Sequence, residues 1–404
     1  MEKSDFYKHS RDDLPGPLNG VMVLEATTTW AGPMAGCILA DFGATVIKVE
    51  HPQGEVIRRL PPFLPDSELT IPNETVNRNK KNVSLNLQHP LGREAFLKLA
   101  ETADIVIENF RPGTLSKWGV GYEQVAAVKA DIVYVSISGF GQFGPLSDRV
   151  GYDPIAQNYC GWTSVNGDPG GAPVKAPTYL GDDTAGLHGA LGAMAALRHR
   201  DQTGEGQHVD ISLVDALLYQ SNGYPTAGAL GLPIKRWGNQ FAIASPINNY
   251  PCKDGNVFAG VLLDTHWQKL ARHLGREDLA SLTNAERISN REEVDHLLRD
   301  YCAAKDVDTV VRNFAEMGLP ATRVNTYEEV VKEEHVISRD MLQPVTLADG
   351  KTVPIVGPAV KFSRTPVRIR EPAATLGQHN ETVLGELGYT REEIAKIESE
   401  GIHQ

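Results

Sequence analysis

The stretch that decides the fold is "VMVLEATTTWAGPMAGCILADFGATVIKVE", residues 21–50. Residues 21–27 and 45–50 are short apolar runs of the kind that form buried parallel strands. Between them, apolar side chains recur with helical spacing over 32–44. A strand, a helix and a second strand in so short a segment form a βαβ unit. Such a unit implies a parallel sheet, because its crossover returns the chain to the same edge.

The same alternation continues along the chain. It predicts a helix over 92–103, strands over 104–110, 131–138 and 207–213, and a helix from Asp215. Residues 1–220 are therefore expected to form the first part of a Rossmann-like large domain of the α/β class. The proline-rich residues 58–74 are expected to form an irregular loop, and long loops of this kind are usually functional or mobile.

The composition of the chain changes after residue 220. Residues 221–334 combine short strand-like pieces and turn residues with amphipathic helices over 264–274 and 291–305, which predicts a smaller α+β domain. Residues 335–404 hold further short strands and a helical end. We expect this last segment to return and complete the large domain.

Charge and cysteine usage limit the function classes. The 404 residues hold 39 Lys and Arg against 51 Asp and Glu, a formal net charge of -12. Such a surface repels phosphate backbones and anionic membranes, so neither nucleic acid nor a membrane is an expected partner. The four cysteines are far apart and form no CxxC pair, which argues against a zinc site and favours a reducing compartment. With no signal peptide and no apolar run of about 20 residues, a cytoplasmic location is expected.

No nucleotide-loop, serine-hydrolase or zinc-protease motif occurs in the structural context that its chemistry requires. Basic side chains instead gather in three places. They are Arg58 and Arg59, then Arg78, Lys80 and Lys81, then Arg111 and Lys117. In an acidic chain, such a cluster near strand ends indicates a site for an anion such as a phosphate. The other interpretation is a solvated loop face, since Lys and Arg are common on surfaces.

Glycine-rich turns follow three of the predicted strands: "TTWAGPMAG", "ENFRPGT" and "SISGFGQFGP". Open α/β sheets bind their ligands at the carboxyl ends of strands, which makes these turns candidate ligand contacts. Each turn taken alone is also compatible with a simple tight connection.

Two adjacent aspartates, Asp182 and Asp183, stand at the start of a predicted helix of small and apolar residues. A carboxylate at a helix start can cap free backbone N–H groups, so Asp183 is expected to act as a helix cap or as an electrostatic neighbour of Asp182. A carboxylate held beside another one in a partly apolar niche is also a usable nucleophile.

Over nearly its whole length the chain resembles the family III CoA-transferases, the group that contains formyl-CoA transferase. The stretches that carry the resemblance are "LNGVMVLEATTTWAGPMAGCILADFGATVIKVEHP", "NRNKKNVSLNL", "DIVIENFRPGTLSKWGVGYE", "SISGFGQFGP", "GYDPIAQ", "GDDTAGLHGALGAMAAL", "TGEGQHVDISLVDAL", "RWGNQ", "GPAVKFSRTP" and "LGQHNETVLGELG". The resemblance implies two interlocked subunits, each threaded through the other, and transfer of CoA from an acyl-CoA to a free carboxylic acid. It implies no metal.

The resemblance assigns the nucleophile to Asp182, which would form mixed anhydrides and an aspartyl-CoA thioester. Residues that match the family's CoA contacts are Ala31, Lys80, Asn109, Phe110, Gly139, Phe140 and Gly141. Three positions depart from formyl-CoA transferase: His51 replaces an arginine, Trp30 a glutamine and Ser138 a lysine. The basic residue that holds the CoA phosphates is therefore open, with Arg78, Arg111 and Lys117 as candidates.

The loop "GNQFAIASP" places Phe241, Ala242, Ile243 and Ala244 where formyl-CoA transferase has glycines. This change predicts a larger, partly apolar acid as substrate, such as benzylsuccinate, with succinyl-CoA as donor. Enzymes of this kind are built as homodimers or with a related sister subunit, and a chain that keeps Asp182 would be the catalytic one.

Two other functions stay open. The same fold hosts 2-methylacyl-CoA racemases, whose "GHD" turn supplies a histidine base; this chain has Tyr152 between Gly151 and Asp153. Two-base proton exchange needs a second titratable group within reach, so the missing histidine counts against a racemase. A non-catalytic CoA-binding subunit is the third interpretation, and an intact Asp182 counts against it.

Overall fold

The computed structural model describes residues 1–401, and the side chains of residues 1–399. The chain divides into two compact units. Unit 1 holds residues 1–162, 175–226 and the chain from 337 onward, and unit 2 holds residues 163–174 and 227–336. Residues 163–174, which lie within the 1–220 segment expected from the sequence, thus cluster with unit 2.

Unit 1 is built on a six-stranded sheet in the order β3-β2-β1-β4-β5-β6. The strands are β1 (Met22–Ala26), β2 (Thr45–Glu50), β3 (Lys80–Ser84), β4 (Ile105–Glu108), β5 (Val133–Ser138) and β6 (Gln207–Ser212). All five pairings are parallel, with Leu24 opposite Ile47 on one side and Val106 on the other. The α/β class and the parallel sheet predicted from the sequence are confirmed. The strand order reverses between β1 and β4, which is where sheets of this type open a crevice for ligands.

The sheet carries one apolar cluster on each face. On one face, the first cluster packs Val23, Val46, Ile107 and Val135 against small side chains of helices α2 (Ala31–Asp41) and α9 (Leu180–Thr203). Alternate residues such as Leu24 and Val106 point to the other face and pack in the second cluster. The remaining helical segments of unit 1 are α1 (Lys3–Phe6), η1 (Val56–Arg59), α3 (Ile71–Val76), α4 (Pro90–Thr102), α5 (Thr114–Trp118), α6 (Tyr122–Val128), α7 (Asp153–Tyr159), α10 (Leu213–Tyr219), α18 (Asn380–Glu386) and α19 (Arg391–Gly401).

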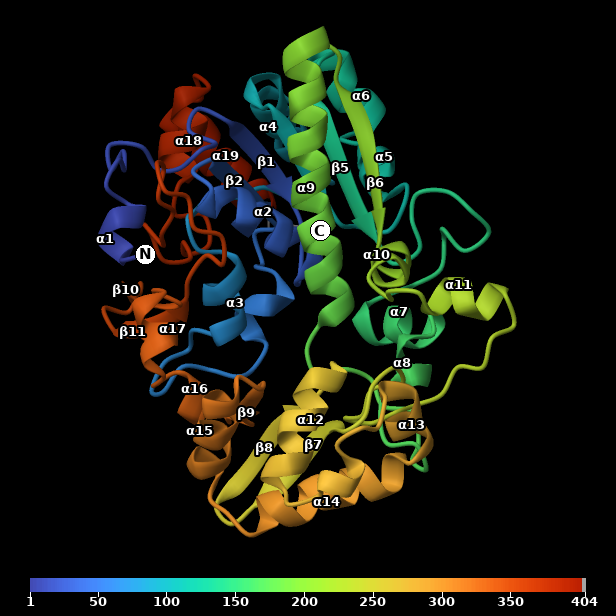
Figure 1. Ribbon diagram of the computed structural model, residues 1–404. Coiled ribbons are helices and arrows are strands. Elements are labelled where there is room, and N and C mark those ends of the chain that lie inside the picture. The colour runs from blue at the N-terminus through green and yellow to red at the C-terminus, as the bar shows by residue number, and fades with distance from the viewer. Residues whose placement is uncertain (402–404) are drawn as a thin grey trace. The chain divides into compact units, whose positions relative to one another are not determined.

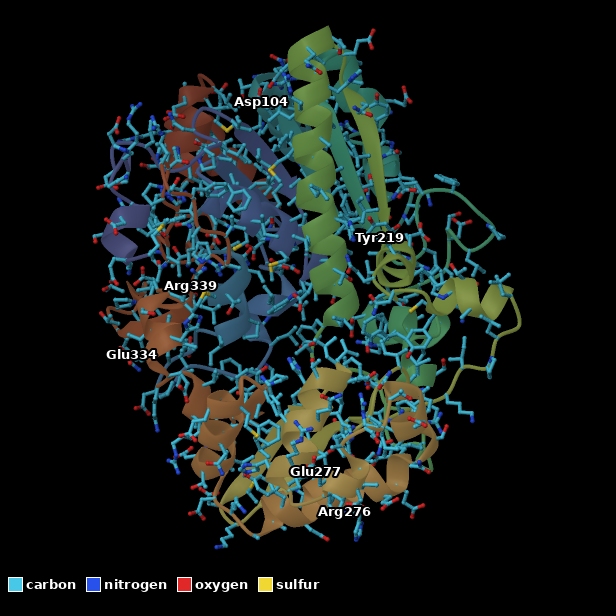
Figure 2. All side chains as sticks on the ribbon, in the orientation of Figure 1. Asp104, Tyr219, Arg276, Glu277, Glu334 and Arg339 are labelled. Carbon is cyan, nitrogen blue, oxygen red and sulfur yellow. The ribbon has the colours of Figure 1, made fainter. Side chains whose placement is uncertain are left out.

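Helix α9 runs along the sheet beside α2 (Figure 1). Glycines on α9 let the two helices approach closely, because a Cβ on Gly186 would lie 2.9 Å from the Ala31 carbonyl oxygen. At its carboxyl end, Arg200 forms an ion pair of 2.7 Å with Asp104, which Figure 2 labels. This ion pair joins the carboxyl end of α9 to the residue that precedes β4.

Three segments differ from the sequence-based expectations. Residues 80–84 form strand β3 rather than only a basic loop. The strand lacks the apolar pattern of a buried strand because its buried Lys80 and Asn82 side chains are stabilised by polar partners. The 58–74 segment, expected to be irregular, begins within η1 and ends in α3. Helix α10 also begins earlier than Asp215, at Leu213, because Ser212 accepts a hydrogen bond from the Asp215 N–H and caps it.

The carboxyl-terminal segment covers the edge strand β3. His379 accepts the Asn82 N–H at 3.1 Å, and Asn380 accepts the Ser84 N–H at 2.8 Å. These bonds satisfy donors that an edge strand would otherwise expose. A hairpin of β10 (Leu342–Thr346) and β11 (Thr352–Val356) precedes this segment.

Unit 2 has a three-stranded antiparallel sheet and its own apolar core. The strands are β7 (Ile247–Cys252), β8 (Gly255–Gly260) and β9 (Ala321–Arg323). The helical segments are α12 (Asp264–His273), η2 (Glu277–Leu279), α13 (Asn284–Ser289), α14 (Arg291–Ala303), α15 (Val307–Met317) and α16 (Tyr327–Val330), with α8 (Trp162–Val165), α11 (Tyr224–Ala229) and α17 (Glu334–Ser338) at the unit boundaries. Trp267, Leu298 and Phe314 are fully buried at the centre of this core.

Within residues 1–401, no helix is long and apolar enough to cross a membrane. The cytoplasmic location, the interlocked dimer and the domain boundaries expected from the sequence stay predictions.

Candidate active site

The predicted ligand contacts of unit 1 lie mostly where parallel strands end. Trp30 and Ala31 follow β1, His51 follows β2, Asn109 to Arg111 follow β4, and the Ser138–Gly141 turn follows β5. Parallel strands that run in register bring these ends to one edge of the sheet. The four turns therefore share the edge at which the strand order reverses.

A pocket of about 350 Å³ opens at this edge. Its wall combines the turns after β1, β2 and β3 with two aromatic side chains that follow β4. The residues that line it include Thr27, Thr28, His51, Asn86, Phe110 and Trp118. The rings of Phe110 and Trp118 contact each other edge to face at 5.2 Å. The pocket thus offers an aromatic wall and several amide and hydroxyl groups.

The loop from Thr27 to Trp30 connects this pocket to the start of α9. Asn109 holds the loop with two hydrogen bonds of 2.8 Å, one to the Thr28 N–H and one to the Thr28 carbonyl. Glu55 accepts the Thr29 N–H at 2.6 Å. At the far end of the loop, the Trp30 indole N–H donates to Asp183 at 2.6 Å. The Asn109 side chain thus holds the backbone of this loop at Thr28.

A buried ionic network supports the same loop. Lys48 pairs with Glu55 at 2.8 Å and with Glu25 at 3.3 Å, and Lys80 pairs with Glu25 at 2.7 Å. All four side chains are almost fully buried, and two acids balance two bases. Buried charges persist only when they are paired in this way.

Two of the predicted CoA contacts are committed to partners inside the protein. Lys80 also donates to the Pro33 carbonyl at 2.8 Å, and burial lowers its pKa. Arg78 is paired with Asp41 at 2.7 Å. Neither residue lines the pocket of about 350 Å³. The candidates whose side chains are exposed are His51, Arg111 and Lys117.

Asp182 lies in the first turn of α9 and is partly buried. Burial, followed by the nearby carboxylates of Asp153 and Asp183, raises its pKa to about 7. Among the described residues, no hydrogen-bond donor is found on the Asp182 carboxylate, whereas both neighbouring aspartates accept hydrogen bonds. A carboxylate without donors in a site of low polarity keeps its lone pairs available for reaction.

Asp183 does not cap the helix, so the capping role expected from the sequence is wrong, whereas the other expected role, an electrostatic neighbour of Asp182, agrees with its contribution to the raised pKa of Asp182. It accepts the Trp30 indole N–H, and the free N–H of Gly181 is satisfied at 2.7 Å by Asp153 instead. Sequence proximity favours a local cap, but here a side chain from α7, 28 residues earlier, occupies that place. Burial raises the pKa of Asp183, which the Trp30 hydrogen bond partly offsets.

The Ser138–Gly141 turn is shaped by close contacts. Ser138 accepts the Gly141 N–H at 3.0 Å, and a Cβ on Gly139 would lie 2.6 Å from the Gly151 Cα. Only glycine allows that approach. Phe140 contacts Tyr159 edge to face at 5.2 Å.

The loop Phe241–Ala244 belongs to unit 2, where Ala244 is buried and Phe241 and Ile243 are 50% and 68% exposed. Arg291 donates to the carbonyl oxygens of Ala242 and Ala244, and Asn284 donates to that of Ile243. The loop therefore has a fixed backbone and presents two apolar side chains.

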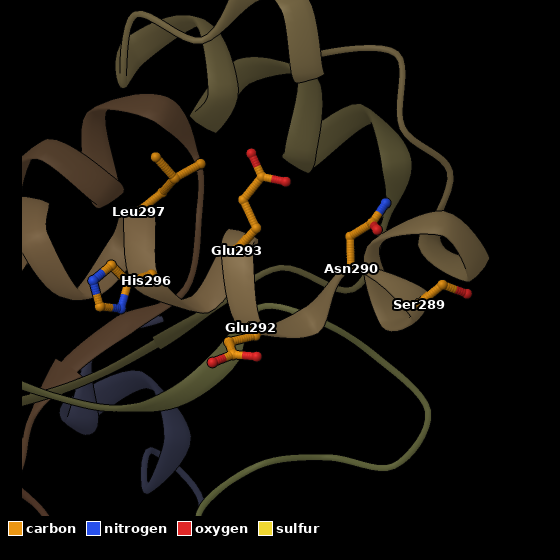
Figure 3. Close-up of a pocket in the computed structure, with 6 residues that line it drawn as sticks. All are labelled: Ser289, Asn290, Glu292, Glu293, His296 and Leu297. Carbon is orange, nitrogen blue, oxygen red and sulfur yellow. The ribbon is translucent and has the colours of Figure 1, made fainter.

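A second hollow, of about 600 Å³, lies along α14 in unit 2 (Figure 3). Glu292 and Glu293 project from the helix into this region together with His296. Two carboxylates repel carboxylic acids and phosphates, so this hollow does not suit an anionic substrate. Among the described residues, no group of three or more His, Cys, Asp or Glu that could hold a metal is found.

The sequence-based prediction did not include Asp153, Gln157, Asn86 or Trp118. Asn86 follows β3, which was not recognised as a strand, and Trp118 lies nine residues beyond Asn109 in the same connection. Both belong to stretches that carry the family resemblance, so their place after a strand was a usable signal. Asp153 and Gln157 also lie in such a stretch, "GYDPIAQ", but that stretch follows no predicted strand, and the Gly181 N–H that Asp153 accepts is 28 residues further along the chain.

Known proteins match the chain over most of its length. The family model described as CoA-transferase family III matches residues 18–380. The chain is 35% identical over 398 residues to the succinyl-CoA–L-malate CoA-transferase beta subunit of Chloroflexus aurantiacus, covering 96% of this chain and 98% of that protein. It is 34% identical over 392 residues to the succinate–glutarate CoA-transferase of Agrobacterium fabrum, covering 93% and 97%.

A solved structure agrees with these matches. A CAIB/BAIF family protein from Brucella suis superposes with a TM-score of 0.83 at 31% identity, covering 92% of this chain and all of that one. The family expected from the sequence is thereby confirmed. The chain belongs to CoA-transferase family III, and it is an enzyme that transfers CoA between an acyl-CoA and an acid.

Proposed function

We propose that this enzyme transfers CoA from succinyl-CoA to a second dicarboxylic acid, with the carboxylate of Asp182 as nucleophile. The observation that carries the proposal is the free Asp182 carboxylate at the start of α9, next to two aspartates that have hydrogen-bond donors. The loop from Thr27 to Trp30 links the adjacent Asp183 to a pocket at the carboxyl edge of the sheet.

The reaction follows from the nucleophile. A carboxylate oxygen of Asp182 forms a bond to the thioester carbon and the C–S bond breaks. CoA departs as the thiolate, and the acyl group stays on Asp182 as a mixed anhydride. The thiolate then attacks the Asp182 carbonyl carbon and releases the donor acid, which leaves an aspartyl-CoA thioester. The acceptor carboxylate attacks that thioester and expels the thiolate. The thiolate finally attacks the acceptor's carbonyl carbon, which frees Asp182.

CoA binding is proposed at the pocket after β1, β2 and β3. The rings of Phe110 and Trp118 suit the adenine. The exposed Arg111 and Lys117 cations and the exposed His51 ring suit the phosphates. The pantetheine arm would run along Thr28 to Ala31 and under the Gly139–Gly141 turn toward Asp182. Lys80 and Arg78 support the site from within, because their charges are paired.

The acceptor is proposed to be a dicarboxylic acid with an apolar substituent, such as benzylsuccinate. The relatives named above act with malate or glutarate, and both are dicarboxylates. Trp30 packs edge to face on Tyr179 at 5.0 Å next to the aspartates, and Phe241 and Ile243 are available in unit 2. These aromatic and branched side chains suit an acid larger than formate or oxalate.

The assembly is proposed to be an interlocked dimer, either of two identical chains or with a related subunit. One relative is itself the beta subunit of a two-subunit enzyme, which supports the second possibility. Since Asp182 is present, this chain would supply a reactive carboxylate in either case.

The decisive experiment combines trapping with an acceptor screen. The protein is incubated with succinyl-CoA and then hydroxylamine, and the peptide with Asp182 is analysed by mass spectrometry. We expect a hydroxamate on Asp182 in the wild type and none in Asp182→Asn, which should also lose turnover by more than about 10³-fold. An unmodified Asp182 in an active enzyme would contradict the mechanism.

The screen offers malate, glutarate, benzylsuccinate, formate and oxalate with succinyl-CoA and with acetyl-CoA. We expect the dicarboxylates with succinyl-CoA to have the highest kcat/KM, and benzylsuccinate to exceed oxalate. Preference for formate or oxalate would refute the acceptor class. Deuterium exchange at the α-carbon of a 2-methylacyl-CoA without any acceptor would instead indicate a racemase.

A further inference from the structure

Asp153 and Gln157 on helix α7 form a clamp around the start of α9. Asp153 Oδ1 accepts the Gly181 N–H at 2.7 Å, and both of its oxygens accept Gln157 Nε2, at 3.0 and 2.8 Å. Gln157 Oε1 accepts the Ala176 N–H at 2.8 Å. One pair of side chains thus holds the residue before Asp182 and also the segment that leads to it.

Burial makes this clamp rigid. Asp153 is 2% exposed and Gln157 is fully buried, so neither can exchange its partners for water. Gly181 is buried between them and Leu217, since a Cβ on Gly181 would lie 3.1 Å from Asp153 Oδ1 and 3.2 Å from Leu217. A shift in the first turn of α9 would therefore break hydrogen bonds that nothing else can replace.

The charge of Asp153 also acts on Asp182. The ionisable groups that act on Asp182 are Asp153 from α7 and Asp183 from α9 itself, and the loop from β1 contributes the neutral Trp30 indole to Asp183. Like charges raise the free energy of the Asp182 carboxylate. Acylation removes the charge from Asp182 and transfers it to the departing sulfur, so the repulsion is relieved as the C–O bond forms and the C–S bond breaks.

We infer that Asp153 is a positioning residue for the Asp182 nucleophile: it fixes the first turn of α9 through Gly181 and Gln157, and its charge favours acylation of the neighbouring carboxylate. This inference rests on the proposed role of Asp182 and adds a residue that acts through it.

Two variants separate the two effects. Asp153→Asn keeps an oxygen for the Gly181 N–H but removes the charge. We expect kcat to fall about 10-fold to 100-fold with little change in KM for succinyl-CoA, and the acidic limb of kcat/KM to move below pH 7. Gln157→Ala releases Ala176 without changing charge. For Gln157→Ala we expect kcat to fall while the acidic limb of the kcat/KM profile stays where it is in the wild type. Asp153→Glu keeps the charge, so its acidic limb should lie closer to neutral pH than that of Asp153→Asn.

The matched control is Asp104→Asn. Asp104 also accepts a backbone N–H at 2.7 Å, that of Met22, and it pairs with Arg200 at the other end of α9. Its partner Arg200 lies about 27 Å from Asp182 along α9, at a rise of 1.5 Å per residue. Asp104→Asn should reduce stability and leave kcat and the pH profile as in the wild type, which Asp153→Asn should not.

A direct titration distinguishes failure of the inference from failure of the proposed function. The carboxyl carbons of ¹³C-labelled aspartate are titrated by NMR, with Asp182 assigned from Asp182→Asn; Asp153→Asn should lower the pKa of Asp182. If Asp153→Asn has the same kcat, the same acidic limb of kcat/KM and the same Asp182 pKa as the wild type, the inference is overturned, even when Asp182→Asn is inactive. Full activity of Asp182→Asn would overturn the proposed nucleophile, and the titration would still report the contact.

Discussion

Three aspartates around the start of α9 differ mainly in their hydrogen-bond partners. Asp153 accepts the Gly181 N–H and Gln157, and Asp183 accepts Trp30. Asp182 lies between them with a raised pKa of about 7. The same residue type thus serves as a clamp, an anchor for an aromatic side chain, and a candidate nucleophile, depending on the donors that surround it.

The raised pKa of Asp182 predicts a cost in stability. Because the native state holds a proton that the unfolded state releases above pH 4, the contribution of Asp182 to stability is lost as pH rises through about 7. Asp182→Asn should therefore raise the free energy of unfolding by about 1–2 kcal/mol at pH 8, after discounting for partial exposure, and by nearly nothing at pH 4. Urea unfolding at both pH values measures this, and an equal change at both would contradict it.

Lys80 provides a test of its structural role. Its removal leaves Glu25 buried with less compensation, so Lys80→Ala should lower the free energy of unfolding by about 3–5 kcal/mol. The control is Lys81→Ala at the adjacent, half-buried position, which should cost less than about 1 kcal/mol. Thermal and urea unfolding compare the two variants. Native stability of Lys80→Ala combined with a raised KM for succinyl-CoA would show that the CoA contact implied by the family resemblance is the better assignment.

At the scale of elements, the pairing of α2 with α9 positions the site. Trp30 precedes α2 and Asp182 lies in the first turn of α9, so the distance between the two helices also sets the distance between the loop after β1 and the aspartates. Small residues at the contact make that approach possible, which is why α9 lacks the large apolar stripe of an ordinary amphipathic helix.

Gly186→Ala tests this packing. The new Cβ would lie 2.9 Å from the Ala31 carbonyl oxygen and from the Met34 Cβ, so the helices must separate. We expect a loss of about 1–3 kcal/mol in the free energy of unfolding and a lower kcat. Gly385→Ala in α18, where nothing lies within 4 Å, is the control and should change stability by about 1 kcal/mol or less, in the stabilising direction. Equal effects of the two changes on unfolding would contradict the packing argument.

At the scale of the whole molecule, two units with separate cores form one chain, and unit 1 is assembled from three segments. Unit 1 holds the candidate nucleophile on α9 and the pocket at the sheet edge, while the substrate loop predicted from the sequence lies in unit 2.

The interlocked dimer predicts unusual exchange behaviour. Subunits that are threaded through each other cannot separate without unfolding. When isotopically heavy and light protein are mixed under native conditions, native mass spectrometry should detect no mixed dimers after a day. Unfolding and refolding the mixture should then produce them in the statistical ratio. Rapid mixing without denaturant would contradict interlocking, and a monomer would contradict the dimer itself.

Much of the fold was predictable from local patterns. The apolar runs at 21–27, 45–50 and 131–138 and the helical spacing between them report the period of each element, and the structure has a strand at each run. Strand β3 was missed because Lys80 and Asn82 break the apolar pattern. Such a strand is stabilised by ion pairs and amide contacts with distant residues, which no local period reveals.

The alternation of strands and helices in the sequence determined the α/β class, and the ordered motifs identified the family. The resemblance to that family then implied Asp182 as the candidate nucleophile. Only the tertiary structure decided which charges are free. In the structure Lys80 is paired with Glu25 and Arg78 with Asp41, and Asp183 accepts a hydrogen bond from the Trp30 indole N–H. The physical reason is that an ionisable group's role depends on burial and on partners brought together from far along the chain.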